Sequence, residues 1–240
     1  MEKLIYLLWK DEAESRGDFS RRLLSELPHS LPPAYAHGLQ LNVVDEAIRP
    51  AEHMLIENEK PRFYAMVSLW LDTALARQPA EAAMARHARR IAGYLVTESC
   101  PLRDHDRVVE AGQRSYGFSQ VVLLRRPPRL TYREWLDIWQ GSHTSVAIES
   151  QSTYRYRQNV IARALTADAP DTQAIVEECF PPAAMTSWQS FYGAEGDDAL
   201  FMRNSRNMVQ SCRRFIDFDK IEACATSEYH FQTIMPAAGR

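Results

Sequence analysis

The sequence has little of what marks metal, disulfide or membrane proteins. Its 240 residues include four cysteines, at positions 100, 179, 212 and 224, and no two of them form a C-x-x-C pair. This scatter gives no indication of a zinc site or a disulfide framework. The early apolar run 4–9 is too short to span a bilayer and lacks the basic leader of a signal peptide. We therefore expect a cytoplasmic protein with no membrane association.

Charge and motifs also fail to indicate nucleic acid or a nucleotide cofactor. The 28 basic and 31 acidic side chains leave a net charge of −3, which provides no basic surface for nucleic acid. The sequence contains no phosphate-binding glycine motif, no G-x-S-x-G and no H-E-x-x-H. We expect no cofactor and no metal. A small molecule is the expected partner, and a homodimer stays open.

What the sequence does contain is an internal repeat, which bears on the whole fold. The apolar runs 3–9 and 119–125 superpose, and later matches follow in the same order at offsets that only grow. These matches are 42–44 with 159–161, 65–68 with 184–187, and 89–91 with 213–215. The constant order favours an internal duplication.

Each half then shows the same order of predicted elements. In the first half they are strand 3–9, helix 16–27, strand 36–45, strand 63–72, helix 80–91 and strand 93–99. In the second half they are strand 118–125, helix 132–143, strand 154–163, strand 184–192, helix 198–215 and strand 220–230. The insertion 171–180 leaves room for a further helix, closed by Pro181 and Pro182.

This order predicts an α+β fold built from two tandem ferredoxin-like βαββαβ units. Each unit is an antiparallel sheet with both helices on one face. The free faces of the two sheets would pack together and form an intrachain dimeric α/β barrel. We assign residues 1–100 to a degenerate first half, 101–117 to a linker and 118–231 to the second half.

Polar and aromatic side chains gather in the second half only. Trp135, Trp139 and His143 follow one another at helical spacing along one face. The predicted strands that follow carry Tyr156, Gln158, Asn159, Trp188 and Tyr192. In the first half, Leu27 and Leu39 occupy the positions of His143 and Tyr156. This asymmetry predicts a functional site, and the larger cavity, in the second half.

An imidazole, a phenol and a carboxamide beside aromatic rings suit acid/base chemistry without a cofactor. We interpret His143 as the general acid/base, and Tyr156 and Asn159 as catalytic groups that orient the substrate or hold an enolate oxygen. The substrate-binding residues would be Trp135, Trp139, Gln158, Trp188 and Tyr192. Weaker candidates to pair with His143 are Glu149, Glu228 and His230. The alternative is that His143 only caps a helix and the aromatic rings are core.

The spacing Trp135-x-x-x-Trp139-x-x-x-His143, followed by Tyr156-Arg157-Gln158-Asn159, resembles the EthD family of dimeric α/β-barrel proteins. The segment 215–217 is similar too, so the resemblance covers about the last half of the chain. It implies the ferredoxin-like barrel and, loosely, an activity. We expect a lyase or isomerase such as a dehydratase, decarboxylase or cyclase, acting on a small aromatic or polyketide-like molecule. The alternatives are a non-catalytic module that binds a ligand or self-assembles, a cofactor-free monooxygenase, and a haem-binding protein.

Overall fold

The structure, a computed structural model, describes residues 1–32, 35–107 and 109–232. The first half contains β1 (Glu2–Trp9), α1 (Arg16–Ser30), β2 (Gly38–Val43), the 3-10 helix η1 (Glu46–Met54), β3 (Ala65–Leu71), the 3-10 turn η2 (Ala74–Ala76), α2 (Gln78–His87) and β4 (Arg90–Leu102). The second half contains β5 (Phe118–Leu124), α3 (Tyr132–Ile138), the π-helical turn η3 (Trp139–His143), α4 (Thr144–Ser150), β6 (Arg155–Ala164), β7 (Ala174–Phe180), the 3-10 turn η4 (Pro182–Met185), α5 (Trp188–Phe191), α6 (Asp198–Phe215) and β8 (Glu222–Gln232).

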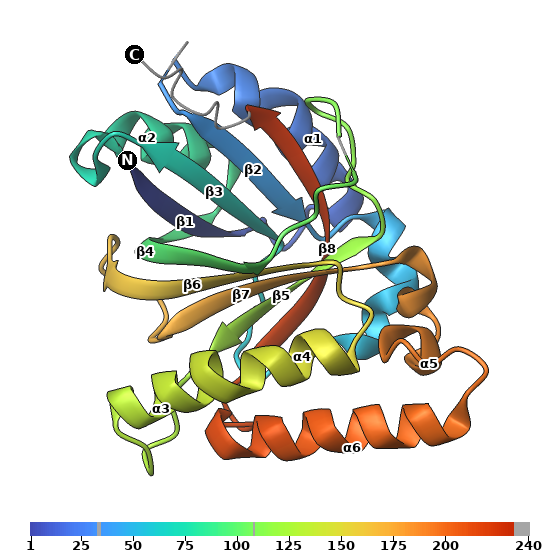
Figure 1. The fold of residues 1–240 in the computed structure, drawn as a ribbon. Coiled ribbons are helices and arrows are strands. Elements are labelled where there is room, and N and C mark those ends of the chain that lie inside the picture. Colours follow the sequence, from blue (N-terminus) through green and yellow to red (C-terminus); the bar gives the residue numbers. More distant parts are fainter. Residues whose placement is uncertain (33–34, 108, 233–240) are drawn as a thin grey trace, which may run out of the picture.

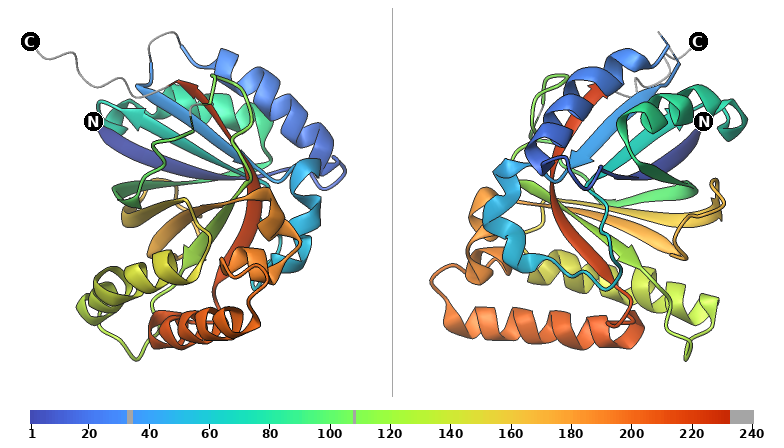
Figure 2. Two further views of the ribbon diagram at one scale, coloured as in Figure 1. Left: turned by 45° about the vertical axis from the view of Figure 1, so that its right-hand side comes forward. Right: turned by 180° about the vertical axis from the view of Figure 1, so that it is seen from behind.

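The eight strands form one closed antiparallel barrel, in the order β1-β3-β2-β8-β5-β7-β6-β4. Helices α1 and α2 cover the outside of one half of the barrel, and α3, α4 and α6 cover the outside of the other half (Figures 1 and 2). Among the described residues, no helix has the length and apolar character needed to cross a bilayer.

The two halves order their strands in the same way. Within each half, the last strand lies beside the first, followed by the third and the second. The halves join through the pairs β2–β8 and β4–β6, both antiparallel. The predicted α+β class and barrel are therefore confirmed. That the halves are duplicated copies of one ferredoxin-like unit stays a prediction.

Side chains that accept hydrogen bonds from backbone amides define where the covering helices begin. Thr131 and Glu134 form a reciprocal capping box at the start of α3. Ser15 caps α1 and Asp197 caps α6 by accepting a single bond from a first-turn amide, without the reciprocal bond. The predicted helix 132–143 does not stop at its last residue, because the π-helical turn η3 leads directly into α4.

The predicted strand at 184–192 is wrong, and so is the helix expected at 171–180. The third strand of the second half is β7, and residues 184–192 contain η4 and α5 instead. The repeat match of 65–68 with 184–187 is wrong for the same reason, because it pairs a strand with a segment that is not one. Every residue of β7 is buried, because the barrel interior covers one of its faces and the helices cover the other. Its two glutamates, Glu177 and Glu178, are both buried as well.

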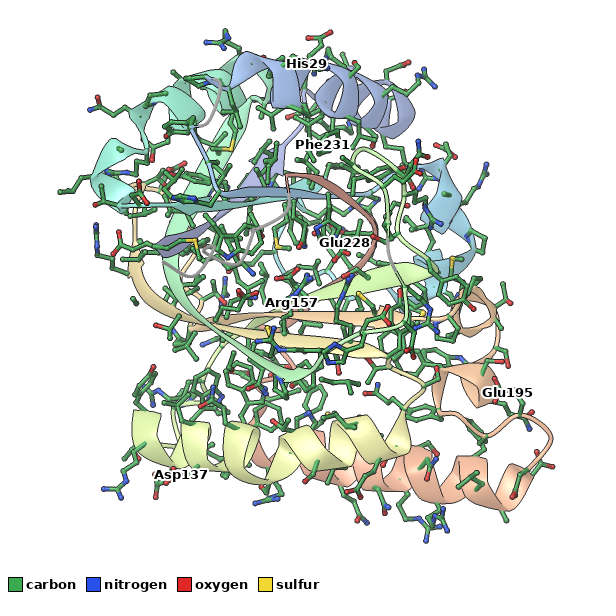
Figure 3. The ribbon with its side chains drawn as sticks, turned by 45° about the horizontal axis from the view of Figure 1, so that its top comes forward. His29, Asp137, Arg157, Glu195, Glu228 and Phe231 are labelled. Atoms are coloured by element: carbon green, nitrogen blue, oxygen red, sulfur yellow. The ribbon has the colours of Figure 1, made fainter. Side chains whose placement is uncertain are left out.

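The inside of the barrel is apolar at one end and charged at the other. Residues such as Ile5, Leu7 and Val121 form the apolar part. At the charged end, Lys3 Nζ lies 3.0 Å from Glu177 Oε1, and Arg157 Nη1 lies 3.3 Å from Glu177 Oε2. Arg157 Nη1 also lies 3.2 Å from Glu228 Oε2 (Figure 3). Such buried charges are tolerated because each has an opposite charge as its partner.

Candidate functional site

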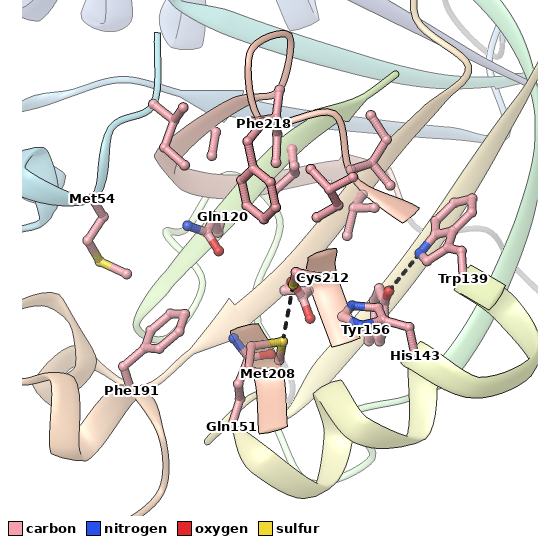
Figure 4. Close-up of a pocket in the computed structure, with 18 of the residues that line it drawn as sticks. Met54, Gln120, Trp139, His143, Gln151, Tyr156, Phe191, Met208, Cys212 and Phe218 are labelled. Carbon is pink, nitrogen blue, oxygen red and sulfur yellow. Dashed lines mark hydrogen bonds between the residues drawn. The ribbon is translucent and has the colours of Figure 1, made fainter. Parts of the chain in front are cut away.

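A cavity of about 230 Å³ lies between the outer face of the second-half sheet and the helices that cover it (Figure 4). Its aromatic lining consists of Trp139, Tyr156, Trp188, Phe191, Tyr192, Phe215 and Phe218. The other polar side chains in the lining are Gln120, His143, Gln151, Glu178 and Cys212. Met54 and Ile56 reach it from the first half. An engineered cavity of about 150 Å³ holds benzene, so this one suits a small flat aromatic molecule.

The π-helical turn η3 brings Trp139 and His143 to the same cavity. The backbone amide of Thr144 donates to the carbonyl of Trp139, the wider spacing that defines a π-turn. The Thr144 hydroxyl donates to the same carbonyl at 3.0 Å and accepts from Gln158 Nε2 at 2.7 Å. Gln158, predicted to bind substrate, is not among the cavity-lining residues, and its amide instead fixes the turn that carries Trp139 and His143.

Tyr156 and Trp139 form a buried polar pair at one side of the cavity. Trp139 Nε1 donates to Tyr156 Oη at 3.1 Å, as the dashed line in Figure 4 shows. Burial, and secondarily the carboxyl of Glu178, raise the pKa of Tyr156 above its usual value. The phenol is therefore protonated at any physiological pH and can donate its own O–H to a ligand.

His143 lines the cavity as a neutral imidazole. Its Nδ1 lies 2.9 Å from Ser211 Oγ, and its ring centroid lies 4.5 Å from that of Phe215. Burial, with a smaller contribution from Arg214, lowers the pKa of His143 to about 4. At neutral pH the ring carries no charge. Because Ser211 engages Nδ1, Nε2 is the nitrogen that has no partner among the described residues.

The weaker candidates do not pair with His143. Glu228 and His230 pair with each other inside the barrel, where Oε1 and Nε2 are 2.7 Å apart. Glu149 is exposed on α4, and the polar partner of His143 is Ser211 instead.

Glu178 is the functional candidate that the sequence did not reveal. It lies on the outer face of β7, in register with Gln120 of β5 and Tyr156 of β6. Its Oε1 is buried and has no hydrogen-bond partner among the described residues. Burial raises the pKa of Glu178 to about 7. A carboxyl group whose pKa is near neutrality therefore lies against an aromatic cavity. The available signal was two glutamates inside an otherwise apolar run.

Asn159 does not belong to this site. It lies on the opposite face of β6 from Tyr156, inside the barrel, where Nδ2 donates to the carbonyl of Ile175 and to Glu177 Oε1, both at 3.0 Å. Successive side chains of a strand alternate between faces, so residues three apart cannot share one side. The predicted pairing of Tyr156 and Asn159 in one site is therefore wrong.

Three of the four aromatic residues predicted to bind substrate as part of a wall line the cavity, and one lies behind it. Trp139 lines the cavity, whereas Trp135 is fully buried behind it, with ring centroids 5.2 Å apart. Trp188 and Tyr192 also line the cavity, but they come from α5 and the residue after it rather than from a strand. Trp188 is 46% exposed and lies at the edge of the cavity.

The prediction that the larger cavity lies in the second half is wrong. A hollow of about 350 Å³ lies at the end of α1, where first-half residues such as Leu39 form all of the described lining but Phe231 of β8. The two differ in chemistry, because His29 is the one ionisable side chain among the described residues that line the first-half hollow.

The aromatic cavity does not fit a haem. Ligand pockets for drug-sized molecules span about 300–1,000 Å³, and this cavity is below that range. A haem also carries two propionates, which need cationic partners, and the described lining residues include no lysine or arginine. Among the described residues, no group of three His, Cys, Asp or Glu side chains is placed to hold a metal ion.

Comparison with known proteins shows the fold. No protein-family model matches the sequence, and no curated protein matches it. An anthrone oxidase-like protein superposes with a TM-score of 0.55 and 9% identity, covering 99% of this chain and 96% of the other. A candidate monooxygenase from Fusobacterium nucleatum subsp. nucleatum superposes with a TM-score of 0.50 and 11% identity, covering 96% and 92%. Both are dimeric α/β-barrel proteins, so this chain has a barrel of that class.

These neighbours overturn the predicted reaction class. Neither is named as a lyase or an isomerase, and both names refer to oxidation. The prediction of a dehydratase, decarboxylase or cyclase is therefore wrong.

Proposed function

We propose that the chain is an oxidase or monooxygenase that oxidises a small, flat aromatic molecule with molecular oxygen and no cofactor. The observation that carries the proposal is Glu178, whose unpartnered carboxyl has a pKa of about 7 in an aromatic cavity. A base with a pKa near the working pH is the most effective kind at neutrality. The names of the two structural neighbours favour oxidation over other base-initiated chemistry.

The substrate class follows from the groups around Glu178. A base of this strength can remove a proton from a carbon that lies between two aromatic rings and is conjugated through them with a carbonyl, because the resulting enolate is delocalised. The Tyr156 hydroxyl, which stays protonated, supports the enolate oxygen by donating a hydrogen bond. His143 Nε2 provides a second, neutral contact for a polar edge of the ring system.

Oxygen then reacts with the enolate carbon. The enolate passes one electron to O₂, and the radical pair combines to form a C–O bond and a peroxide anion. The proton held by Glu178 transfers to the peroxide oxygen and leaves a hydroperoxide. Removal of the remaining C–H proton breaks the O–O bond, so that a CH₂ group and O₂ become a C=O group and water. The aromatic walls exclude bulk water from the enolate until oxygen reacts with it.

The proposal also includes two finer statements about origin. The motif of Trp135, Trp139 and His143 supports a relationship to EthD-like proteins. The equal strand order of the two halves supports their descent from one ferredoxin-like unit.

Oxygen uptake with anthrone as the probe tests the proposed activity. We expect the protein to consume one O₂ per anthrone at pH 8 and to form anthraquinone, above the rate of spontaneous oxidation. Glu178→Gln should reduce the catalysed rate by roughly 10²–10⁴-fold, the usual contribution of a positioned base. The matched control Glu149→Gln changes the same group on the exposed surface of α4 and should leave the rate unchanged. Binding of anthrone without oxygen uptake would instead identify a ligand-binding module.

A further inference from the structure

A third hollow lies at the charged end of the barrel, on the opposite face of β6 from the aromatic cavity. Its volume is about 230 Å³. Its lining residues are Cys100, Leu102, Arg103, Asp104, His105, Arg155 and Arg157. Arg155 and Arg157 are two residues apart on one strand, so both side chains point to the same side, away from Tyr156.

The two guanidinium groups are held in place from within the barrel. Arg155 Nη2 contacts Glu228 Oε1, and Arg157 Nη1 donates to Gln40 Oε1 at 2.8 Å and to Glu228 Oε2 at 3.2 Å. Arg155 Nε is buried and has no acceptor among the described residues. Arg157 Nη2 likewise has no acceptor in the described part of the chain. The arginines are thus preorganised by Glu228 and Gln40 and retain unused N–H donors.

The charges around the hollow leave a small positive surplus. The cations are Lys3, Arg103, Arg155 and Arg157, and the carboxylates that face them are Glu98, Glu177 and Glu228. Asp104 is already neutralised by Arg107, whose Nη1 lies 3.1 Å from Oδ1. One positive charge therefore remains without a partner, and His105 adds a further donor at the rim.

We propose that this hollow binds the carboxylate of a small organic acid. A planar carboxylate matches the fork of a guanidinium group better than any other common anion of a single charge. The surplus of one charge favours a monoanion over a phosphate dianion. Leu102 provides an apolar contact for a short carbon chain. The site is independent of the aromatic cavity and of the activity proposed for it.

Cys100 supplies a local reporter, because it lines this hollow and is partly exposed. Cys179 and Cys224 are buried, and the partly exposed Cys212 lines the aromatic cavity instead. The rate at which iodoacetamide alkylates Cys100, followed by peptide mass spectrometry, therefore reports on occupancy of the hollow. The rate at Cys212 in the same sample reports on the other cavity.

The experiment uses butyrate as the probe and butyramide, its neutral isostere, as the control, at constant ionic strength. We expect butyrate to slow alkylation of Cys100 several-fold and saturably, with no change at Cys212 and no effect of butyramide. Arg103→Gln, at the exposed rim, should weaken the protection by about five- to tenfold in butyrate concentration, as expected for the loss of one charged contact. Arg163→Gln removes the same charge from an exposed position on β6 and should change nothing.

Three results would overturn the proposal. Equal protection by butyrate and butyramide would show that charge is not recognised. Protection that does not saturate, or none at all, would show that there is no site. Equal weakening by Arg103→Gln and Arg163→Gln would show a general effect of surface charge rather than a contact in the hollow. Both variants change exposed residues, so a failure to fold does not obscure the result.

Discussion

Glu177 and Glu178 follow each other on β7, and their carboxyl groups titrate in opposite directions. Burial opposes ionisation of both. Inside the barrel, Lys3 and Arg157 outweigh burial and hold the pKa of Glu177 at about 2. On the outer face, no such partner is present among the described residues, and burial raises the pKa of Glu178 to about 7. Alternation along one strand thus separates a carboxylate with charged partners from one without them.

Replacing Glu178 should stabilise the protein at alkaline pH. The folded-state pKa of about 7 exceeds the unfolded value of about 4.3. The contribution of this group to stability is therefore complete below pH 4.3 and is lost as pH rises through 7. Glu178→Gln removes that loss. The difference in free energy of unfolding between the variant and the wild type should therefore shift in favour of the variant between pH 5 and pH 8, by on the order of 3 kcal/mol.

Urea unfolding of both proteins at the two pH values measures this difference. Glu149→Gln, an exposed control, should show no such dependence on pH. A difference for Glu178→Gln that is the same at pH 5 and pH 8 would mean that the carboxyl of Glu178 is not buried in the way described.

His143 should contribute to turnover without holding the fold together. Because its pKa is about 4, the imidazole is neutral, and it acts as a hydrogen-bonding group rather than as a base. His143→Leu should reduce turnover by roughly 10²–10³-fold, the usual contribution of one positioned hydrogen-bonding group. It also leaves the buried Ser211 hydroxyl without its hydrogen-bond partner, which should lower the free energy of unfolding by about 1–3 kcal/mol.

The double variant His143→Leu/Ser211→Ala removes both polar partners and should recover most of that stability. Leu27 already occupies the position matched to His143 in the first half, where it is fully buried. Thermal melts and oxygen uptake on the single and double variants make the comparison. Unchanged turnover in His143→Leu would end its functional assignment.

At the scale of elements, the parts predicted well are those whose partners are nearby or whose pattern is unambiguous. The apolar run at 3–9 is β1 within one residue, and helix 198–215 is α6 with the predicted bounds. The capping box at Thr131 is local chemistry, and it marks the start of α3 as expected. These features need only neighbouring residues to define them.

The strand β7 was not predicted, because its stability comes from residues that are distant in the sequence. Glu177 can be buried inside the barrel because Lys3 and Arg157 pair with it there. Both partners are distant in the sequence, so the residues around 177 do not predict them. Because β7 was not predicted, Glu178 was not assigned to any strand face. The best candidate base was therefore absent from the predicted site. The separation of Tyr156 from Asn159, by contrast, was predictable, because a spacing of three places them on opposite faces of any strand.

The contact between β1 and β7 across the barrel should be an acid-sensitive link in the fold, beside the one that Glu228 forms with Arg155 and Arg157. Glu177 has a folded-state pKa of about 2, below its unfolded value, so its contribution to stability is present above about pH 4.3 and is lost as pH falls toward 2. Lys3→Met leaves Glu177 short of a partner in a buried site. We expect a loss of about 3–5 kcal/mol at pH 7 and an acid-unfolding midpoint at higher pH.

Circular dichroism as a function of pH and urea concentration tests this link. Lys60→Met, which removes a lysine from an exposed loop, is the matched control and should behave as the wild type. A loss below 1 kcal/mol in Lys3→Met would show that Arg157 alone is sufficient to hold Glu177 ionised.

At the scale of the whole molecule, the closed barrel determines what each half can do alone. The strand pairs β2–β8 and β4–β6 join the halves, so no barrel strand among the described residues presents a free edge. A homodimer, which stays a prediction, would therefore have to use another surface. The apolar part of the barrel interior draws residues from both halves, including Ile5 and Met66 from one and Val121 and Ile175 from the other.

Because the halves share this core, the intact chain should unfold in a single cooperative transition, and neither half should be stable alone. Separate fragments 1–117 and 118–240 would each expose two unpaired strand edges and one apolar sheet face. We expect each fragment to aggregate or self-associate, and co-expression to yield a one-to-one complex with the near-ultraviolet circular dichroism of the intact chain. Size-exclusion chromatography with light scattering measures the masses. Two monomeric fragments, each melting at the temperature of the intact chain, would contradict the shared core and show that the barrel is two domains that merely touch.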